Sequence, residues 1–284
     1  MANRGEPVNA MRIVSPRLRN MLASRSCAWK IVAMRRGFKP SAGPANRMRF
    51  WGRHAVLAAL ANPERNVRRI WGTRDALMSL DLPPVLPVTY AEASDLARMV
   101  PHDAPHQGIV AEVDPLPDMW LGDLLEAGAR DQRPLVILDQ VTDPHNVGAV
   151  LRSAAAFDAL GLVTQDRHSP PESGALARAA SGALELVPWV RVVNLARALD
   201  EIAEAGFWRI GLSGHANQTL TQAMGKARVA LVLGSEGEGM RPNTEAHCDD
   251  LAKLPISHRV ESLNISNAAA IALYAAATRS AEGS

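Results

Sequence analysis

The second half of the chain alternates short, almost wholly apolar runs with amphipathic segments. The runs are "LVILD", "GLVTQ", "LVPWVRV", "WRIGLSG", "VALVLG" and "LAKLPIS", and the segments include "VGAVLRSAAAF", "GALARAASGALE" and "NLARALDEIAEAG". Strands without a polar face are typical of a parallel sheet covered by helices on both faces. The pattern therefore predicts an α/β domain with a parallel sheet over residues 134–284.

A smaller region with a similar alternation precedes it. "FWGRHAVLAALANP" has apolar residues at helical spacing and ends at an Asn-Pro pair, and the strand-like pieces "RRIWGT", "VLPVTYA" and "GIVAEV" follow, with the helix-like "DALMSL" and "ASDLARMV" between them. We expect a small α/β domain over residues 50–114. Two prolines in "DPLPDMW", followed by the helix-like "LGDLLEAGARDQR", predict a linker and a connecting helix over residues 115–133.

Charge is distributed unevenly along the chain. Residues 1–49 hold eleven Lys or Arg and one acid, Glu6. This composition predicts a disordered basic arm that adds a salt-sensitive contribution to RNA affinity, or a targeting segment for an organelle. The start of translation is left open by four internal methionines: Met11, Met21, Met34 and Met48.

The composition excludes several classes of protein. It is globular, with 47% apolar and 21% charged residues, and no apolar run reaches the ~18 to 20 residues that a transmembrane helix needs. Cys27 and Cys248 are too few for a disulfide framework and lack the spacing of a zinc site. We therefore expect a cytoplasmic protein with no membrane contact and no bound metal.

Polar residues cluster after three of the predicted strands, where parallel sheets bind their ligands. The first cluster contains Asn146, Gly148 and Arg152. Gly148 allows a backbone or a ligand to come close, and Arg152 stands among apolar neighbours, where it either extends to the surface or serves the site. His145 would be a chemically easy base, but a histidine at a helix start is more typical of a surface.

The second cluster is the loop "GSEGEG", residues 234–239, and the third precedes the alanine-rich helix at the end of the chain. Three glycines in six residues predict a tight loop with exposed amides, whereas Glu236 and Glu238 would repel phosphate. The loop therefore suits a ligand that is not a polyphosphate. The third cluster, "SLNIS", carries more polar side chains than a single N-cap requires.

In this order and spacing, N-x-G-x-x-x-R, G-x-E-x-x-G and S-L-N-I-S resemble the three-motif signature of the SpoU (TrmH) family of RNA ribose 2′-O-methyltransferases, in the SPOUT superfamily. "GRHAVLAAL" and "HQGIVAEV" resemble the substrate-binding domain of its RlmB-type branch, the 23S rRNA guanosine 2′-O-methyltransferases, so the resemblance implies that residues 50–114 bind the RNA substrate. "EAHCDDL" resembles the same branch. The third motif has Leu-Pro-Ile where the family usually has Ile-Pro-Met, and Ala275 stands where an acid is common. Neither departure touches the implied chemistry.

The resemblance implies a deep trefoil knot in the catalytic domain, a first domain similar to ribosomal protein L30e, a homodimer, and structured RNA as the substrate. It also implies S-adenosylmethionine as the cofactor. The implied cofactor-binding residues are Gly234, Leu254 and Leu263, with Leu233, Ile256 and Ser266 beside them. The implied catalytic residues are Asn146, Arg152, Glu236, Ser262 and Asn264.

Within this interpretation Arg152 is the residue expected nearest the ribose 2′-hydroxyl. Because a guanidinium stays protonated in proteins, we expect it to orient the hydroxyl and to stabilise the developing alkoxide rather than to act as a base. Glu236 would pair with Arg152 or hold a loop of the partner subunit, and Ser262 and Asn264 would orient Arg152 or the nucleotide.

Other functions stay open on the sequence. The RNA could be tRNA instead of rRNA, and the chain could be an RNA-binding or ribosome-assembly protein without methyl transfer. A dinucleotide-dependent oxidoreductase is disfavoured, because "DQVTDPHNVG" stands where the glycine fingerprint should follow the first strand of the sheet.

Overall fold

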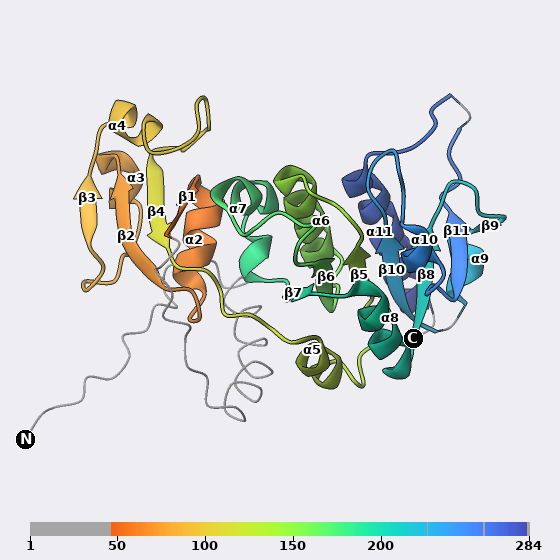
Figure 1. Cartoon of the computed structure of the whole chain (residues 1–284). Helices are drawn as coiled ribbons and strands as arrows, with labels where there is room; N and C mark the ends of the chain where they lie inside the picture. Colours follow the sequence, from red (N-terminus) through yellow and green to blue (C-terminus); the bar gives the residue numbers. More distant parts are fainter. Residues whose placement is uncertain (1–46, 226, 258, 283–284) are drawn as a thin grey trace, which may run out of the picture. The chain divides into compact units, whose positions relative to one another are not determined.

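The computed structural model describes residues 47–225, 227–257 and 259–282, which form two compact units that divide between Pro117 and Asp118 (Figure 1). Apart from its last three residues, the basic arm predicted for residues 1–49 lies outside the described residues.

The first unit is built on a four-stranded mixed sheet in the order β1-β4-β2-β3, in which only β2 and β3 are parallel. The α/β prediction is confirmed here, with one correction. The spacing of apolar residues in "FWGRHAVLAALANP" predicts a helix that includes Phe50 and Trp51, but these two residues pair with β4 in a strand, and Gly52 at φ 83° turns the chain into the helix that follows. The elements are β1 (Met48–Trp51), α2 (Arg53–Ala61), β2 (Val67–Gly72), α3 (Arg74–Met78), β3 (Val88–Tyr90), α4 (Ala93–Ala97) and β4 (Ile109–Val113).

The second unit is built on a seven-stranded sheet, all parallel, in the order β7-β6-β5-β10-β8-β11-β9. The predicted parallel sheet is therefore confirmed. Its strands are β5 (Leu135–Leu138), β6 (Gly161–Gln165), β7 (Trp189–Val192), β8 (Phe207–Leu212), β9 (Gln218–Thr219), β10 (Arg228–Leu233) and β11 (Asp250–Lys253). Its helices are α5 (Leu121–Ala127), α6 (Pro144–Ala156), α7 (Gly174–Ala180), η2 (Ala183–Glu185), α8 (Leu195–Glu204), α9 (Leu220–Met224), α10 (Pro242–Glu245) and α11 (Ile265–Glu282).

Successive strands are added to the sheet first on one side of β5 and then on the other. The chain runs outward from β5 through β6 to β7, crosses to β8, and returns to place β10 between β5 and β8. Leu138 and Leu233 are in register at the carboxyl ends of β5 and β10, and the Asp139 N–H donates to the Leu233 carbonyl oxygen at 2.8 Å. Ligands of open α/β sheets bind where the strand order reverses in this way, so the fold directs attention to the residues after β5 and β10.

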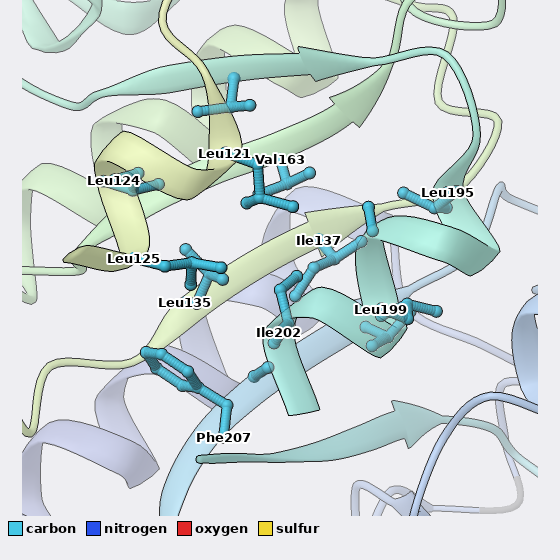
Figure 2. Packing of buried hydrophobic residues seen from close by; sticks show 14 of the residues in the cluster. Leu121, Leu124, Leu125, Leu135, Ile137, Val163, Leu195, Leu199, Ile202 and Phe207 are labelled. Atoms are coloured by element: carbon cyan, nitrogen blue, oxygen red, sulfur yellow. The ribbon is translucent and has the colours of Figure 1, made fainter. Parts of the chain in front are cut away.

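One face of the sheet is covered by α5 and α8 (Figure 2). Leu135 and Ile137 of β5 point into a cluster of leucines and isoleucines from both helices, closed by Phe207 at the start of β8. Alternate residues of a strand face opposite ways, so the buried Val136 and Leu138 face the other layer, where α6 packs against α7 and α11. Burial on both faces explains why the strands read as apolar runs.

Gly148 is the point of close approach between α6 and α7. A Cβ atom there would lie 2.6 Å from both the Leu176 carbonyl oxygen and the Ala179 Cβ, which is inside van der Waals contact. The close approach predicted at Gly148 is therefore made by a neighbouring helix. After α7 the chain breaks at Ser181 and Gly182, both with positive φ, so "GALARAASGALE" forms a helix and a separate 3₁₀ turn instead of one segment.

The segment "EAHCDDL", residues 245–251, is hydrogen-bonded to β8. Asp249 accepts two hydrogen bonds from the Arg209 guanidinium, at 2.9 and 2.7 Å, and one from the Arg209 backbone N–H at 2.8 Å. The side-chain bonds lower the pKa of Asp249 and raise that of Arg209. The next residue, Asp250, accepts from Trp208 of β8 and from Gln218 of β9, so the segment fixes the position of β11 in the sheet.

Cys248 lies in the same segment, and we expect its thiol to be inert in the folded protein. Burial raises its pKa to about 12, so at pH 8 only about one thiol in 10⁴ is ionised. In a Cys27→Ser variant, an aromatic disulfide reagent should release no chromophore at pH 8 until urea unfolds the chain. Rapid labelling of the native variant would contradict the burial of this side chain.

In the part of the chain that the structure describes, no helix is long and apolar enough to cross a membrane.

Candidate active site

The three predicted motifs meet at the carboxylate of Glu236. Its Oε1 atom accepts hydrogen bonds from Asn264 Nδ2 at 2.5 Å, from Asn146 Nδ2 at 3.2 Å and from the Ile265 backbone N–H at 3.2 Å. Asn264 Nδ2 also donates to Asn146 Oδ1 at 3.0 Å. These residues come from the start of α6, the loop after β10 and the start of α11, so one carboxylate joins segments that lie far apart in the sequence.

Local sequence explains why these side chains are presented. Asp143 caps α6 by accepting from the His145 N–H at 2.9 Å, and Pro144 occupies the first helical position, which places Asn146 in the first turn. At the other helix, Asn264 Oδ1 accepts from the Ser266 N–H at 2.9 Å and also from the Ser266 hydroxyl. The polar residues before α11 therefore combine a helix cap with the link to Glu236.

Asn264 has no hydrogen-bonding capacity left for a substrate. A side-chain amide has two N–H donors and two acceptor lone pairs. Both donors are used, on Glu236 and Asn146, and both lone pairs are used by Ser266. Asn264 is therefore a positioning residue in this arrangement.

An ion pair with a buried carboxylate lies at the end of the glycine-rich loop. Asp139, directly after β5, is fully buried, and its carboxylate accepts from the Arg241 backbone N–H at 3.0 Å, from Nε at 2.9 Å and from Nη2 at 2.7 Å. Within the loop, Ser235 and Gly239 exchange backbone hydrogen bonds of 3.0 and 3.1 Å. Asp139 and Arg241 are not among the predicted site residues, although Asp139 directly follows the first strand of the sheet, where a polar residue is informative.

The predicted cofactor residues lie at the end of β10 and directly after it, after β11, and on both sides of the start of α11. Gly234 admits no side chain, because a Cβ there would lie 2.0 Å from the Gly239 carbonyl carbon. Leu233 is buried, Leu254 and Leu263 are partly buried, and the Ile256 side chain is 37% exposed. Backbone polar groups beside apolar side chains, without a phosphate cradle, fit a ligand such as S-adenosylmethionine, which has no phosphate.

Comparison with known families identifies the chain. The sequence model of the SpoU rRNA Methylase family matches residues 133–274, and the model described as RNA 2′-O ribose methyltransferase substrate binding matches residues 50–119. The chain belongs to the SpoU family. The predicted family and its methyltransferase class are thus confirmed.

Relatives of this SpoU chain match both units. A Synechocystis sp. protein named as an uncharacterized tRNA/rRNA methyltransferase is 41% identical over 79% of this chain and 61% of its own length. The 23S rRNA (guanosine-2′-O-)-methyltransferase RlmB of Pseudomonas putida is 36% identical over 80% of this chain and 95% of its own length. The SpoU methyltransferase AviRb from Streptomyces viridochromogenes, crystallised with AdoMet, shares the fold, with a TM-score of 0.69 at 22% identity over 91% of this chain and 99% of its own.

Two predicted catalytic residues of this SpoU chain do not join the Glu236 cluster. Arg152 and Ser262 are exposed, and among the described residues neither side chain forms a hydrogen bond with Asn146, Glu236 or Asn264. The predicted pairing of Arg152 with Glu236 is absent within the chain. The reason is helix geometry, because a residue six positions after Asn146 lies about 9 Å further along α6 and about 120° around it.

The Asn264 amide offers a test of this arrangement. Asn264→Asp keeps the size of the side chain but places a carboxylate oxygen where Nδ2 now donates to Glu236 Oε1 at 2.5 Å. We expect unfolding in urea to show a loss of about 1–3 kcal/mol, since two donors are lost and two carboxylates face each other. Asn267→Asp in the same helix turn, whose side chain is exposed, is the matched control and should leave the midpoint nearly unchanged. Equal stability of both variants would contradict the role of Asn264.

Proposed function

We propose that this SpoU protein transfers the methyl group of S-adenosylmethionine to the ribose 2′-hydroxyl of a guanosine in large-subunit rRNA. The observation that carries the proposal is the junction of all three motifs at Glu236. Its carboxylate accepts hydrogen bonds from Asn146, 90 positions before it, and from Asn264, 28 positions after it. The similarity to RlmB of Pseudomonas putida, which extends over both units, supports the choice of RNA and nucleotide.

The chain's own residues supply position and electrostatics. Gly234, Leu254 and Leu263 would hold the cofactor through backbone groups and apolar contacts, which leaves Leu233, Ile256 and Ser266 as its neighbours. When bound, the cofactor supplies an electrophilic methyl group on a positively charged sulfur. Holding the 2′-oxygen in line with that methyl group is worth roughly 7 to 11 kcal/mol in well-oriented intramolecular models. The link between Glu236, Asn146 and Asn264 would keep the loops in that geometry.

Arg152 would act on the ribose. Its guanidinium would donate hydrogen bonds to the 2′-oxygen and to an adjacent phosphate, with the proton passing to water. Because Arg152 forms no hydrogen bond with the Glu236 cluster of its own chain, we propose that it completes the site of a partner subunit in a homodimer. Ser262, which is also exposed, would contact the same nucleotide.

Exposed apolar side chains on α11 support the proposed homodimer. Ile271 is 44% exposed and Tyr274 is 57% exposed, in a helix that packs against α6. A second copy of the chain would cover them.

The proposal also includes a cytoplasmic location, a first unit of the L30e type and a trefoil knot formed by the segments after β10 and β11. Among the described residues, no group of three or more His, Cys, Asp or Glu side chains is arranged to hold a metal.

Mapping the transferred methyl group tests the proposal. The purified protein is incubated with labelled S-adenosylmethionine and, separately, with unmodified 23S rRNA or unmodified tRNA, and the labelled nucleotide is identified after digestion. We expect label on the ribose of one guanosine of the rRNA. Label on tRNA would replace the proposed RNA, and label on a base would overturn the reaction type. Cofactor binding without transfer to either RNA would favour a role in RNA binding or ribosome assembly.

A further inference from the structure

The arginines of the first unit differ in the groups that their guanidiniums contact. Three form ion pairs: Arg47 with Glu112, Arg68 with Asp114, and Arg98 with Asp95. Three more contact other groups: Arg49 donates to the Met99 carbonyl oxygen, Arg65 donates to the Asp114 carbonyl oxygen, and Arg69 lies over the Trp71 ring. The remaining two are Arg53, which donates to the neutral Ser79 Oγ, and Arg74. Neither has a carboxylate within ion-pair distance among the described residues, and both are exposed.

These two arginines come from different elements that meet at one end of the sheet. Arg53 opens α2, and its backbone N–H donates to the Gln107 side-chain oxygen at 2.9 Å. Arg74 opens α3, and the N–H of the preceding Thr73 donates to the Gly108 carbonyl oxygen at 2.9 Å. The segments "GRHAVLAAL" and "HQGIVAEV", which resemble the RlmB-type branch, are therefore neighbours in space.

The junction is closely packed. The Arg53 guanidinium donates to Ser79 Oγ at 2.9 Å, at the end of the helix that Arg74 begins. A Cβ on Gly108 would lie 2.8 Å from Thr73 Oγ1, so the loop and the start of α3 are in contact. Two histidines border the arginines: His54, which is exposed, and His106, which is partly exposed. Residues 53–54, 73–75 and 106–108 hold two arginines and one acid, Asp75, so guanidiniums outnumber carboxylates at the junction.

We propose that this junction, the Arg53–Arg74 surface made by residues 53–54, 73–74 and 106–108, binds phosphates of the RNA backbone and so holds the substrate on the enzyme. A guanidinium without a carboxylate partner can give its forked donors to a phosphate oxygen pair without first breaking an ion pair. Phosphate contacts fix the register of a nucleic acid without reading its bases. The inference rests on the proposed function and locates one of its RNA contacts.

The test compares charge loss at the two ends of one strand. The variant is Arg53→Gln/Arg74→Gln in the full chain. The control is Arg68→Gln, near the start of β2, where Val67 pairs with Val113, whereas Arg74 follows the opposite end, where Gly72 pairs with Ile109. Arg53→Lys/Arg74→Lys keeps the charge and removes only the forks. The probe is unmodified 23S rRNA, bound on filters over a series of NaCl concentrations.

We expect the double glutamine variant to bind at least about tenfold more weakly at 0.1 M NaCl, and the slope of log Kd against log[NaCl] to fall by about 1.5 for two lost phosphate contacts. The lysine variant should keep the slope, and Arg68→Gln should bind like the wild type. In methyl transfer, the KM for RNA should rise while kcat and cofactor affinity stay unchanged. Unchanged binding of the glutamine variant, or an equal loss in Arg68→Gln, would overturn the inference. Failure of the wild type to methylate any RNA would refute the proposed function alone, since filter binding is read independently.

Discussion

Arg152→Ala is expected to abolish methyl transfer while leaving the affinity for S-adenosylmethionine intact. The side chain is exposed on α6 and forms no hydrogen bond with the described residues, so its removal costs the fold little. Removing one donor to a developing oxyanion lowers kcat by about 10²–10³ in other enzymes, and here the same group would also bind phosphate. Single-turnover transfer of labelled methyl and calorimetric titration of the cofactor measure the two quantities. Arg197→Ala, at an exposed arginine on α8, is the control for loss of charge.

A mixture of variants shows on which chain Arg152 acts. Arg152→Ala and Glu236→Ala are each expected to be inactive alone. If Arg152 completes the partner's site, randomly exchanged subunits give heterodimers with one intact site of two, and about a quarter of the activity returns. No return of activity would place Arg152 and Glu236 in the same site of one chain.

Lost activity in His145→Ala, with a changed pH–rate profile, would assign the proton to His145 instead and contradict the role given to Arg152.

The sequence predicts the parts of this fold that depend on local pattern. The central strands are apolar because both faces of the sheet are covered, and that pattern survives in the sequence. The start of α6 is predictable because Asp143 and Pro144 satisfy the needs of a helix N-terminus. The convergence of Asn146, Glu236 and Asn264 follows from their places after strands that run in parallel, together with the resemblance to a known family.

Long-range order is the part that the local pattern does not contain. Nothing in "VALVLG" places β10 between β5 and β8, because any apolar strand would suit that position. The pairing of Asp139 with Arg241 across 102 residues depends on that placement, so local sequence does not predict it. Short elements such as β9 and η2 also depend on tertiary contacts, and the direction of Arg152 depends on the helical turn at which it falls.

Arg241→Ala should be the most destabilising single change at the site. It leaves the Asp139 carboxylate, fully buried, with one backbone donor in place of three donors. Breaking a buried ion pair on one side costs about 3–5 kcal/mol, because the remaining charge is uncompensated. Urea unfolding at pH 7 measures the loss, and Arg259→Ala, an exposed arginine after β11, should show almost none. Equal midpoints for the two variants would mean that Asp139 does not depend on this partner.

The double variant Asp139→Asn/Arg241→Gln separates stability from loop position. It removes both charges while keeping polar groups of similar size, so most of the lost stability should return. The forked contact that fixes the loop between Gly234 and Arg241 is still missing, because Gln has one amide where Arg has two donating nitrogens aimed at the carboxylate. We therefore expect the affinity for S-adenosylmethionine to stay low while the urea midpoint recovers. Recovery of both together would show that the ion pair only stabilises the fold and does not aim the loop.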